Sequence, residues 1–200
     1  MVQSINYYFY KMNFKNLANK TVNFIADRIK ELVGVTLAVI SVLIAISLIS
    51  YSPDDPNFIY SENTKINNIL GFQGSITSDF MFQSLGLISV LFCLTIFFTG
   101  INVIRYKKIL LLIENLFFSI LYIITGSFFF SIFYPDSFWL TFYGNGGFVG
   151  NLLQDTFLIS LININETISF YFLILITIFF FLISINFNLN SFFRLIKIIF

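Results

Sequence analysis

The sequence predicts an all-α integral membrane protein with four transmembrane helices and both termini on the cytoplasmic side. Three observations predict this fold class: long apolar runs, a low content of charged residues, and basic residues that cluster beside alternate ends of the runs. Hydrophobic residues make up 58% of the 200 residues and charged residues only 10%, whereas typical globular chains carry about 25% charged residues. The four apolar runs are Leu32–Ser50, Phe80–Ile104, Asn115–Tyr134 and Thr167–Ile185.

The positions of the charged residues predict the orientation of these runs. Of the 11 Lys and Arg residues, five precede the first run, three lie between the second and third, and two follow the fourth. The other two connecting segments contain seven of the ten acidic residues and one basic residue, Lys65. Lys and Arg residues near a span are retained on the cytoplasmic side. We therefore expect both ends of the chain in the cytoplasm.

Residues 1–31 are expected to form a basic, cytoplasmic, amphipathic segment that leads into the first span. Apolar residues recur at intervals of three and four from Phe14 to Leu32, which indicates a helix. Its basic residues would face water or anionic headgroups. The pattern also fits a first-span helix that continues inward, and the two interpretations are compatible. We expect this helix to begin at Met12, and we hypothesise that Met12 is the true start of the chain.

Each apolar run has the length and the boundaries of a membrane span. A hydrocarbon core of about 30 Å needs roughly 20 helical residues, and the first span, 32–50, supplies 19 without a charge. The second span, 80–104, has 25 residues and can cross with a tilt. The third span, 115–134, is expected to end before Pro135, because proline and the residue before it disfavour helix. The fourth span is 167–185.

The segments between the spans are short. An outer loop is expected at 51–79, a cytoplasmic loop at 105–114, an outer segment at 135–166, and a cytoplasmic or interfacial tail at 186–200. Within the outer segment, the apolar stretch 157–162 is too short to cross the membrane, so we expect a short surface helix there and no fifth span. Glu114, at the inner end of the third span, fits contact with headgroups or a cation better than a role in proton transfer.

The sequence predicts no catalytic, cofactor-binding or metal-binding residues. It contains no His and one cysteine, Cys93, which removes the commonest general base and the usual nucleophile pairs. It also lacks the G-x-x-x-x-G-K-[ST] pattern of a phosphate-binding loop. The glycine-rich stretch 144–150 is predicted to be a turn. Asp54 and Asp55 lie between two prolines, which favours a rigid turn, and a metal there would need further oxygen ligands.

Three blocks of residues in the outer segments carry a family resemblance. The first block, residues 48–56, reads Leu-Ile-Ser-Tyr-Ser-Pro-Asp-Asp-Pro; the second extends from residue 68 to residue 86; and the third, residues 146–150, reads Gly-Gly-Phe-Val-Gly. In order and position they resemble motifs in the four-span membrane domain of FtsK-type DNA translocases (the FtsK/SpoIIIE family). The positions that match the family motifs are Ser50, Tyr51, Ser52, Pro53, Asp55, Pro56, Asn68, Gly71, Gly74, Asp79, Gly86, Gly146, Gly147 and Gly150.

The resemblance implies a membrane-anchoring and interaction domain of a DNA translocase that acts in cell division and chromosome segregation. It implies a place in the lipid bilayer of the bacterial inner membrane, a homo-oligomer, and contacts with division proteins at the septum. The sequence to Phe200 contains neither the ATPase motor nor the DNA-binding parts of the family, as in a split gene or a fragment. ATP and Mg²⁺ are therefore expected only in the motor, and this chain is expected to have no enzyme activity and no direct contact with nucleic acid.

Two alternatives stay open at this point. The rival function is a small four-span transporter or channel subunit, although no span carries a central ionisable residue and no matched pair of broken helices appears. The small residues of the first and third spans also have two interpretations, since they fit contacts between copies or packing within one subunit. These residues are Gly34, Ser41, Ala45, Ser127 and Ser131.

Overall fold

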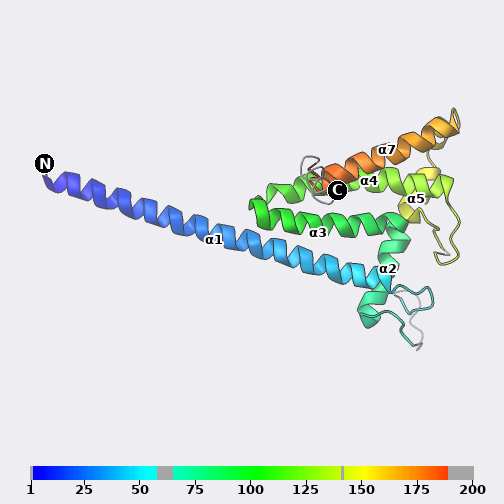
Figure 1. Cartoon of the computed structure of the whole chain (residues 1–200), viewed down its shortest axis with the longest axis horizontal. Helices are drawn as coiled ribbons and strands as arrows, with labels where there is room; N and C mark the ends of the chain where they lie inside the picture. Colours follow the sequence, from blue (N-terminus) through cyan, green and yellow to red (C-terminus); the bar gives the residue numbers. More distant parts are fainter. Residues whose placement is uncertain (1, 58–64, 141, 189–200) are drawn as a thin grey trace, which may run out of the picture.

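The computed structural model of the chain describes residues 2–57, 65–140 and 142–188, and every regular element in these ranges is helical. Four helical segments are long and apolar enough to cross a membrane, as the sequence predicts. They are Ala18–Ile49, Gly71–Tyr106, Leu110–Phe133 and Glu166–Ser184. In space they form a bundle whose connections gather mainly at one end (Figure 1). The expected all-α fold with four span-forming helices is therefore confirmed.

Helix α1 (Val2–Ile49) is one continuous helix of 48 residues. At about 1.5 Å per residue it is about 72 Å long, more than twice the thickness of the hydrocarbon core. Its amino-terminal half projects past the other helices (Figure 1). The expectation that the helix begins at Met12 is wrong: residues 2–11 contain neither proline nor glycine to stop it, and the helix continues back to Val2.

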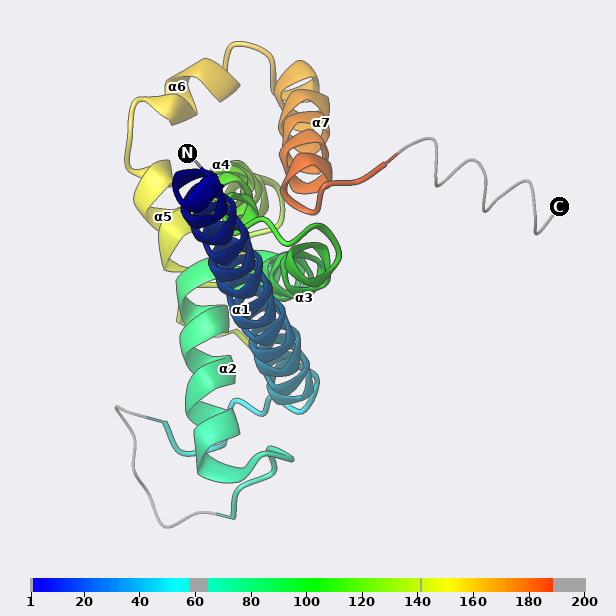
Figure 2. The same ribbon diagram turned by 90° about the vertical axis from the view of Figure 1, so that its left-hand side faces the viewer.

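The second apolar run does not form the single helix expected over Phe80–Ile104. Helix α2 (Gly71–Leu85) ends at Gly86, a 3₁₀ turn η1 (Gly86–Ile88) follows, and helix α3 (Ser89–Tyr106) then continues alongside α1. Both views show α2 lying across the direction of α1 and α3 (Figures 1 and 2). Part of the expected outer loop is thus helical. The helix breaks at Gly86 because its φ of 63° lies outside the range of a right-handed helix.

Helices α4 (Leu110–Phe133) and α7 (Glu166–Ser184) form the second pair of the bundle. Helix α4 ends immediately before Tyr134 and Pro135, where the sequence predicts a stop. The outer segment between them contains two short helices, α5 (Gly147–Gln154) and α6 (Leu158–Ile162). Helix α5 packs on α4 and α2. We call the end of the bundle that carries α2, α5 and α6 the loop end, and the opposite end, with the turn Arg105–Lys108, the basic end.

Hydrogen bonds between buried polar side chains join α3, α4 and α7 inside the bundle. The Thr95 hydroxyl lies 3.0 Å from the Tyr122 hydroxyl and 3.1 Å from that of Ser184. The amide of Asn115 donates to the hydroxyl of Thr99 at 2.8 Å. Because these groups bond to one another, they serve to hold the helices together at a depth where an unpaired polar group is costly. They are the kind of residues that a pore would present, and here they face neighbouring helices.

Candidate functional site: the loop end of the bundle

The three sequence blocks meet at the loop end, although up to about 100 residues separate them along the chain. The first block follows the end of α1, the second begins before α2 and ends at η1, and the third begins α5. Contacts between these blocks determine how the outer loops are held on the bundle.

The carboxylate of Asp55 joins the first block to the second. Asp55 is 5% exposed, and its two oxygens accept hydrogen bonds from the backbone N–H groups of Asn67 and Asn68, each at 2.8 Å. Asp54, next to it, is exposed. The two acids therefore do not form a carboxylate pair, and one of them is a loop-closing residue. No group of three or more His, Cys, Asp or Glu side chains suited to a metal occurs in the described parts of the chain.

Asn68 connects the end of α1 to the start of α2. Its side-chain amide donates to the carbonyl oxygens of Ser47 at 2.9 Å and Ser50 at 3.2 Å, which a helix end would otherwise leave unpaired. Its side-chain oxygen accepts from the N–H of Leu70 at 3.1 Å. Its backbone carbonyl accepts from the N–H of Gly71 at 2.9 Å, where α2 begins. Asn68 is 4% exposed, so these bonds are shielded from water.

Further serine and proline positions of the first block support this connection. The hydroxyl of Ser50 accepts from the N–H of Ile69 at 3.1 Å, and the carbonyl of Ser52 accepts from the N–H of Asp55 at 3.2 Å. The carbonyl of Pro56 accepts from the hydroxyl of Ser75 at 2.6 Å. Pro53 is exposed and only shapes the turn.

Ser47, like Ser75, belongs to this network but was not among the sequence candidates. Its hydroxyl donates to the carbonyl of Gly74, and a side chain at Gly74 would collide with that of Asn68. The only feature of the sequence that could have indicated this role is the position of Ser47 in the last turn of an apolar helix. That feature is too common among membrane spans to single out one residue.

The second and third blocks meet where η1 crosses the start of α5. The carbonyl of Asn145 accepts from the N–H of Leu87 at 3.0 Å. A side chain on Gly86 would collide with that carbonyl, and one on Gly147 would collide with the backbone N–H of Gly86. Two glycines are therefore needed because the two backbones approach within hydrogen-bonding distance.

The third block also packs tightly on α4. A Cβ atom added to Gly146 would lie 2.6 Å from the Cβ of Ser131, and one on Gly150 would collide with the carbonyl of Ser127. The hydroxyl of Ser127 donates to the carbonyl of Leu85 at 3.0 Å, and that of Ser131 donates to the carbonyl of Gly150 at 3.1 Å. Ser127 and Ser131 thus serve packing within one chain.

The small residues of the first span have the same role. A Cβ atom on Gly34 would lie 2.6 Å from the carbonyl oxygen of Gly100, and the hydroxyl of Ser41 donates to the carbonyl of Cys93 at 2.7 Å. Ala45 packs against the buried cluster around Leu48. These residues bring α1 close to α3 and leave the opposite face of α1 uncovered within the chain.

Aromatic rings fill the space between the blocks. The ring centroids of Tyr51 and Phe82 lie 5.0 Å apart, and those of Phe82 and Trp139 lie 5.1 Å apart. Asp79 extends from α2 toward this cluster, where Gln83 donates to its carboxylate at 3.4 Å. Burial, together with the nearby Asp79 carboxylate, raises the pKa of Tyr51 to about 12. Trp139 was not among the sequence candidates, because a single tryptophan in a loop carries no motif.

The loop end therefore forms a platform in which buried hydrogen bonds hold the loops in place. Asp55, Asn68 and Ser50 hold loop backbone in place with their side chains. Five motif glycines, Gly74, Gly86, Gly146, Gly147 and Gly150, allow close contacts. The outward side of the platform carries large apolar side chains: Phe138 is 94% exposed and Phe157 is 76% exposed. Such an arrangement can present a fixed apolar surface to lipid or to another protein.

Comparison with known proteins identifies the same family as the three sequence blocks. Residues 26–196 match the family model described as the 4TM region of DNA translocase FtsK/SpoIIIE. The chain is 31% identical over 83 residues to the DNA translocase FtsK of Bradyrhizobium diazoefficiens, and 35% identical over 74 residues to that of Rickettsia bellii. These matches cover 42% and 37% of this chain but 10% of each relative. No solved structure matches the chain.

Proposed function

Because the chain belongs to the family of the four-transmembrane region of FtsK/SpoIIIE DNA translocases, we propose that it anchors such a translocase in cell division and chromosome segregation. The observation that supports this function best is the match over residues 26–196, which includes most of the first span-forming segment, all of the other three, and every motif position at the loop end. The match is to the membrane region of the family. ATP hydrolysis, with its ATP and Mg²⁺, and contact with DNA would belong to the motor part of a translocase.

We further propose that the chain lies in the bacterial inner membrane with both termini in the cytoplasm. The turn Arg105–Lys108 and the projecting half of α1 lie at the same end of the bundle, and Lys107 contacts Glu31 at 3.0 Å there. The basic residues of the two segments thus gather on one side, as the retention of Lys and Arg in the cytoplasm requires. The exposed Asp54, Asp136 and Lys65 lie toward the loop end.

A domain exchange tests the anchoring function. A bacterium whose own FtsK lacks its membrane region would carry this chain fused to the translocase motor. We expect the fusion to locate at the septum and to restore division. A control fusion carries an unrelated four-span protein of the same orientation. Restoration by the control alone, or by neither fusion, would contradict the proposal.

A homo-oligomer is part of the proposal, and the uncovered face of α1 supports it. Residues Ala18, Val22, Ile25, Ile29 and Leu32 recur at alternating intervals of four and three, the spacing of a helix that pairs with a like helix. The last four are between 53% and 69% exposed. They lie in the part of α1 at and beyond the Glu31–Lys107 contact. This part continues the first span in a straight line, so it points away from the membrane and cannot lie along its surface. A second copy is the partner that fits this repeat.

Cysteine cross-linking tests the oligomer. Ile25 lies on the exposed apolar face formed by this repeat. Under oxidation, Ile25→Cys is expected to give disulfide-linked dimers of the full chain in membranes. Asn23→Cys, which is also exposed but lies on another face of α1, is the matched control and should stay monomeric. Equal cross-linking of both variants would indicate random collision, and none with either would exclude pairing through α1.

Division proteins are the partners proposed for the loop end. The apolar side chain of Phe138 stands outside the platform and is held beside Trp139, which the aromatic cluster fixes. A photo-reactive amino acid at position 138 is expected to form adducts with septal proteins in dividing cells. The control position is Val90, an exposed apolar residue of α3. Lipid adducts alone at both positions would contradict a protein partner.

A further inference from the structure

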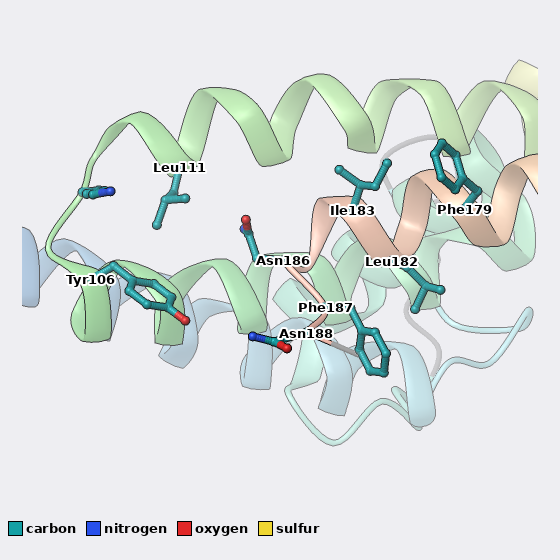
Figure 3. A pocket seen from close by; sticks show the side chains of 9 residues that line it. Tyr106, Leu111, Phe179, Leu182, Ile183, Asn186, Phe187 and Asn188 are labelled. Atoms are coloured by element: carbon teal, nitrogen blue, oxygen red, sulfur yellow. The ribbon is translucent and has the colours of Figure 1, made fainter. Parts of the chain in front are cut away.

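A groove opens at the basic end between the end of α3, the start of α4 and the end of α7. Its volume is about 810 Å³, and Figure 3 shows the side chains that line it. Helices α3 and α7 approach each other near this place through the Asn102 amide, which donates to the carbonyl of Ile185 at 3.0 Å. Beyond that contact the chain turns away from α3, and the groove remains.

The lining of the groove changes from apolar to polar along its length. Phe179, Leu182 and Ile183 of α7 line the part of the groove that lies farther from the turn between α3 and α4, and Phe179 and Ile183 point toward α4 (Figure 3). Tyr106 lies at the other end of the groove (Figure 3), and Lys108, which also lines it, belongs to the turn between α3 and α4. This is the polarity profile of a phospholipid, whose acyl chain lies in the hydrocarbon core and whose phosphate lies at the interface.

The charge at the polar end selects the type of lipid. Of the basic residues in this turn, Lys107 is paired with Glu31 at 3.0 Å, whereas Lys108 is exposed and forms no salt bridge with any residue that the structure describes. Arg105 stacks on the ring of Tyr106 at 5.3 Å. The nearest acid along α4, Glu114, is exposed and does not line the groove. Basic pockets between spans near a membrane surface suit anionic headgroups.

We propose that this groove binds one anionic phospholipid. The acyl chain lies along Phe179, Leu182 and Ile183, and the phosphate is held by the ammonium group of Lys108 with the Tyr106 hydroxyl as a hydrogen-bond donor. Any lipid-facing apolar groove in a bilayer is filled by an acyl chain. The selectivity of the proposed site therefore lies in its recognition of the headgroup. This inference goes beyond the anchoring function and does not depend on it.

Native mass spectrometry of the full chain tests the site with two probe lipids of identical acyl chains, phosphatidylglycerol and phosphatidylcholine. The wild-type chain is expected to retain phosphatidylglycerol in preference to phosphatidylcholine. Lys108→Glu should lower the affinity for phosphatidylglycerol at least about fivefold, the weight of one basic residue near an anionic surface, and leave that for phosphatidylcholine unchanged. Lys20→Glu, an exposed basic residue on the projecting part of α1, is the matched control and should retain the preference.

Further variants separate loss of the site from loss of the fold. Lys108→Arg should keep the preference, and Lys108→Gln replaces the charge reversal if that variant does not fold. Ile183→Trp, which fills the groove, should lower the retention of both lipids. Equal retention of the two lipids by the wild type, or equal losses in Lys108→Glu and Lys20→Glu, would overturn the proposal. Displacement of phosphatidylglycerol by millimolar inorganic phosphate would show a soluble-anion site instead.

Discussion

Asp55 shows how one side chain can define a loop. Its carboxylate is buried and accepts two backbone hydrogen bonds from residues 12 and 13 positions later in the chain. In Asp55→Asn the side chain keeps its shape but loses its charge and one of its acceptors, so a buried N–H loses its partner. Hydrogen bonds to charged groups contribute about 1.5–3 kcal/mol. We expect a free energy of unfolding lower by about 2 kcal/mol, measured by denaturation of the purified chain in micelles.

The matched control for this prediction is the neighbouring residue. Asp54 has the same charge and is exposed, so Asp54→Asn should change the free energy of unfolding by less than about 0.5 kcal/mol. Equal effects of the two substitutions would mean that Asp55 contributes only through its charge. The sequence could not assign different roles to these adjacent acids, because only the path of the folded loop decides which carboxylate faces inward.

The environment of Tyr51 predicts how the stability of the chain depends on pH. Burial first, and the Asp79 carboxylate second, raise its pKa to about 12, above the ordinary value of about 10. The folded chain therefore holds the phenolic proton more tightly than the unfolded chain, and stability is lost as the pH rises from about 10 to about 12. We expect Tyr51→Phe to reduce this loss, as measured by unfolding at a series of alkaline pH values. Identical pH profiles for the two chains would refute the role of Tyr51.

At the scale of elements, the break between α2 and α3 depends on Gly86. Its φ is 63°, and a side chain there would also collide with the carbonyl of Asn145. Gly71 has nearly the same φ, 64°, but a Cβ atom there meets nothing within 4 Å. The two residues therefore separate backbone strain from steric collision within one chain.

We expect Gly71→Ala to cost about 1 kcal/mol, the strain of a left-handed residue. Gly86→Ala should cost about 3 kcal/mol or more, because overpacking adds to the strain. Thermal unfolding of the two variants in the same detergent measures the difference. Equal losses would show that the crossing of η1 and α5 can relax to admit a methyl group.

The elements also show how far the sequence can predict this fold. Apolar length and Pro135 correctly predict four span-forming helices and the end of α4, since both depend on local composition. The break at Gly86 could not be predicted, because Gly86 lies within an apolar run and its φ depends on contact with residue 145, 59 positions later. The motif positions could be named from the sequence because they resemble a family pattern. Ser47 and Trp139, which complete their contacts, could not be named, because their roles also depend on contacts with distant residues.

The whole molecule has two ends of different character. The loop end is held by contacts among distant segments, and the basic end carries the projecting half of α1 (Figure 1) and the groove between α3, α4 and α7. Helix α7 ends toward the basic end, so a motor joined to it would act from there (Figure 1). This arrangement requires the basic end to face the cytoplasm, and the orientation of the bundle is therefore the property on which the proposed function depends.

Labelling of single cysteines tests that orientation. Cys93 is 4% exposed and should not react, so each added cysteine reports alone. A membrane-impermeant maleimide applied to intact spheroplasts is expected to label Lys65→Cys and Asp136→Cys at the loop end. Lys20→Cys and Lys108→Cys should be labelled only after the membrane is permeabilised, because basic residues are retained on the cytoplasmic side. Labelling of position 20 or 108 in intact spheroplasts would show that the bundle has the opposite orientation. The basic end would then lie outside the cytoplasm, where a motor could not act.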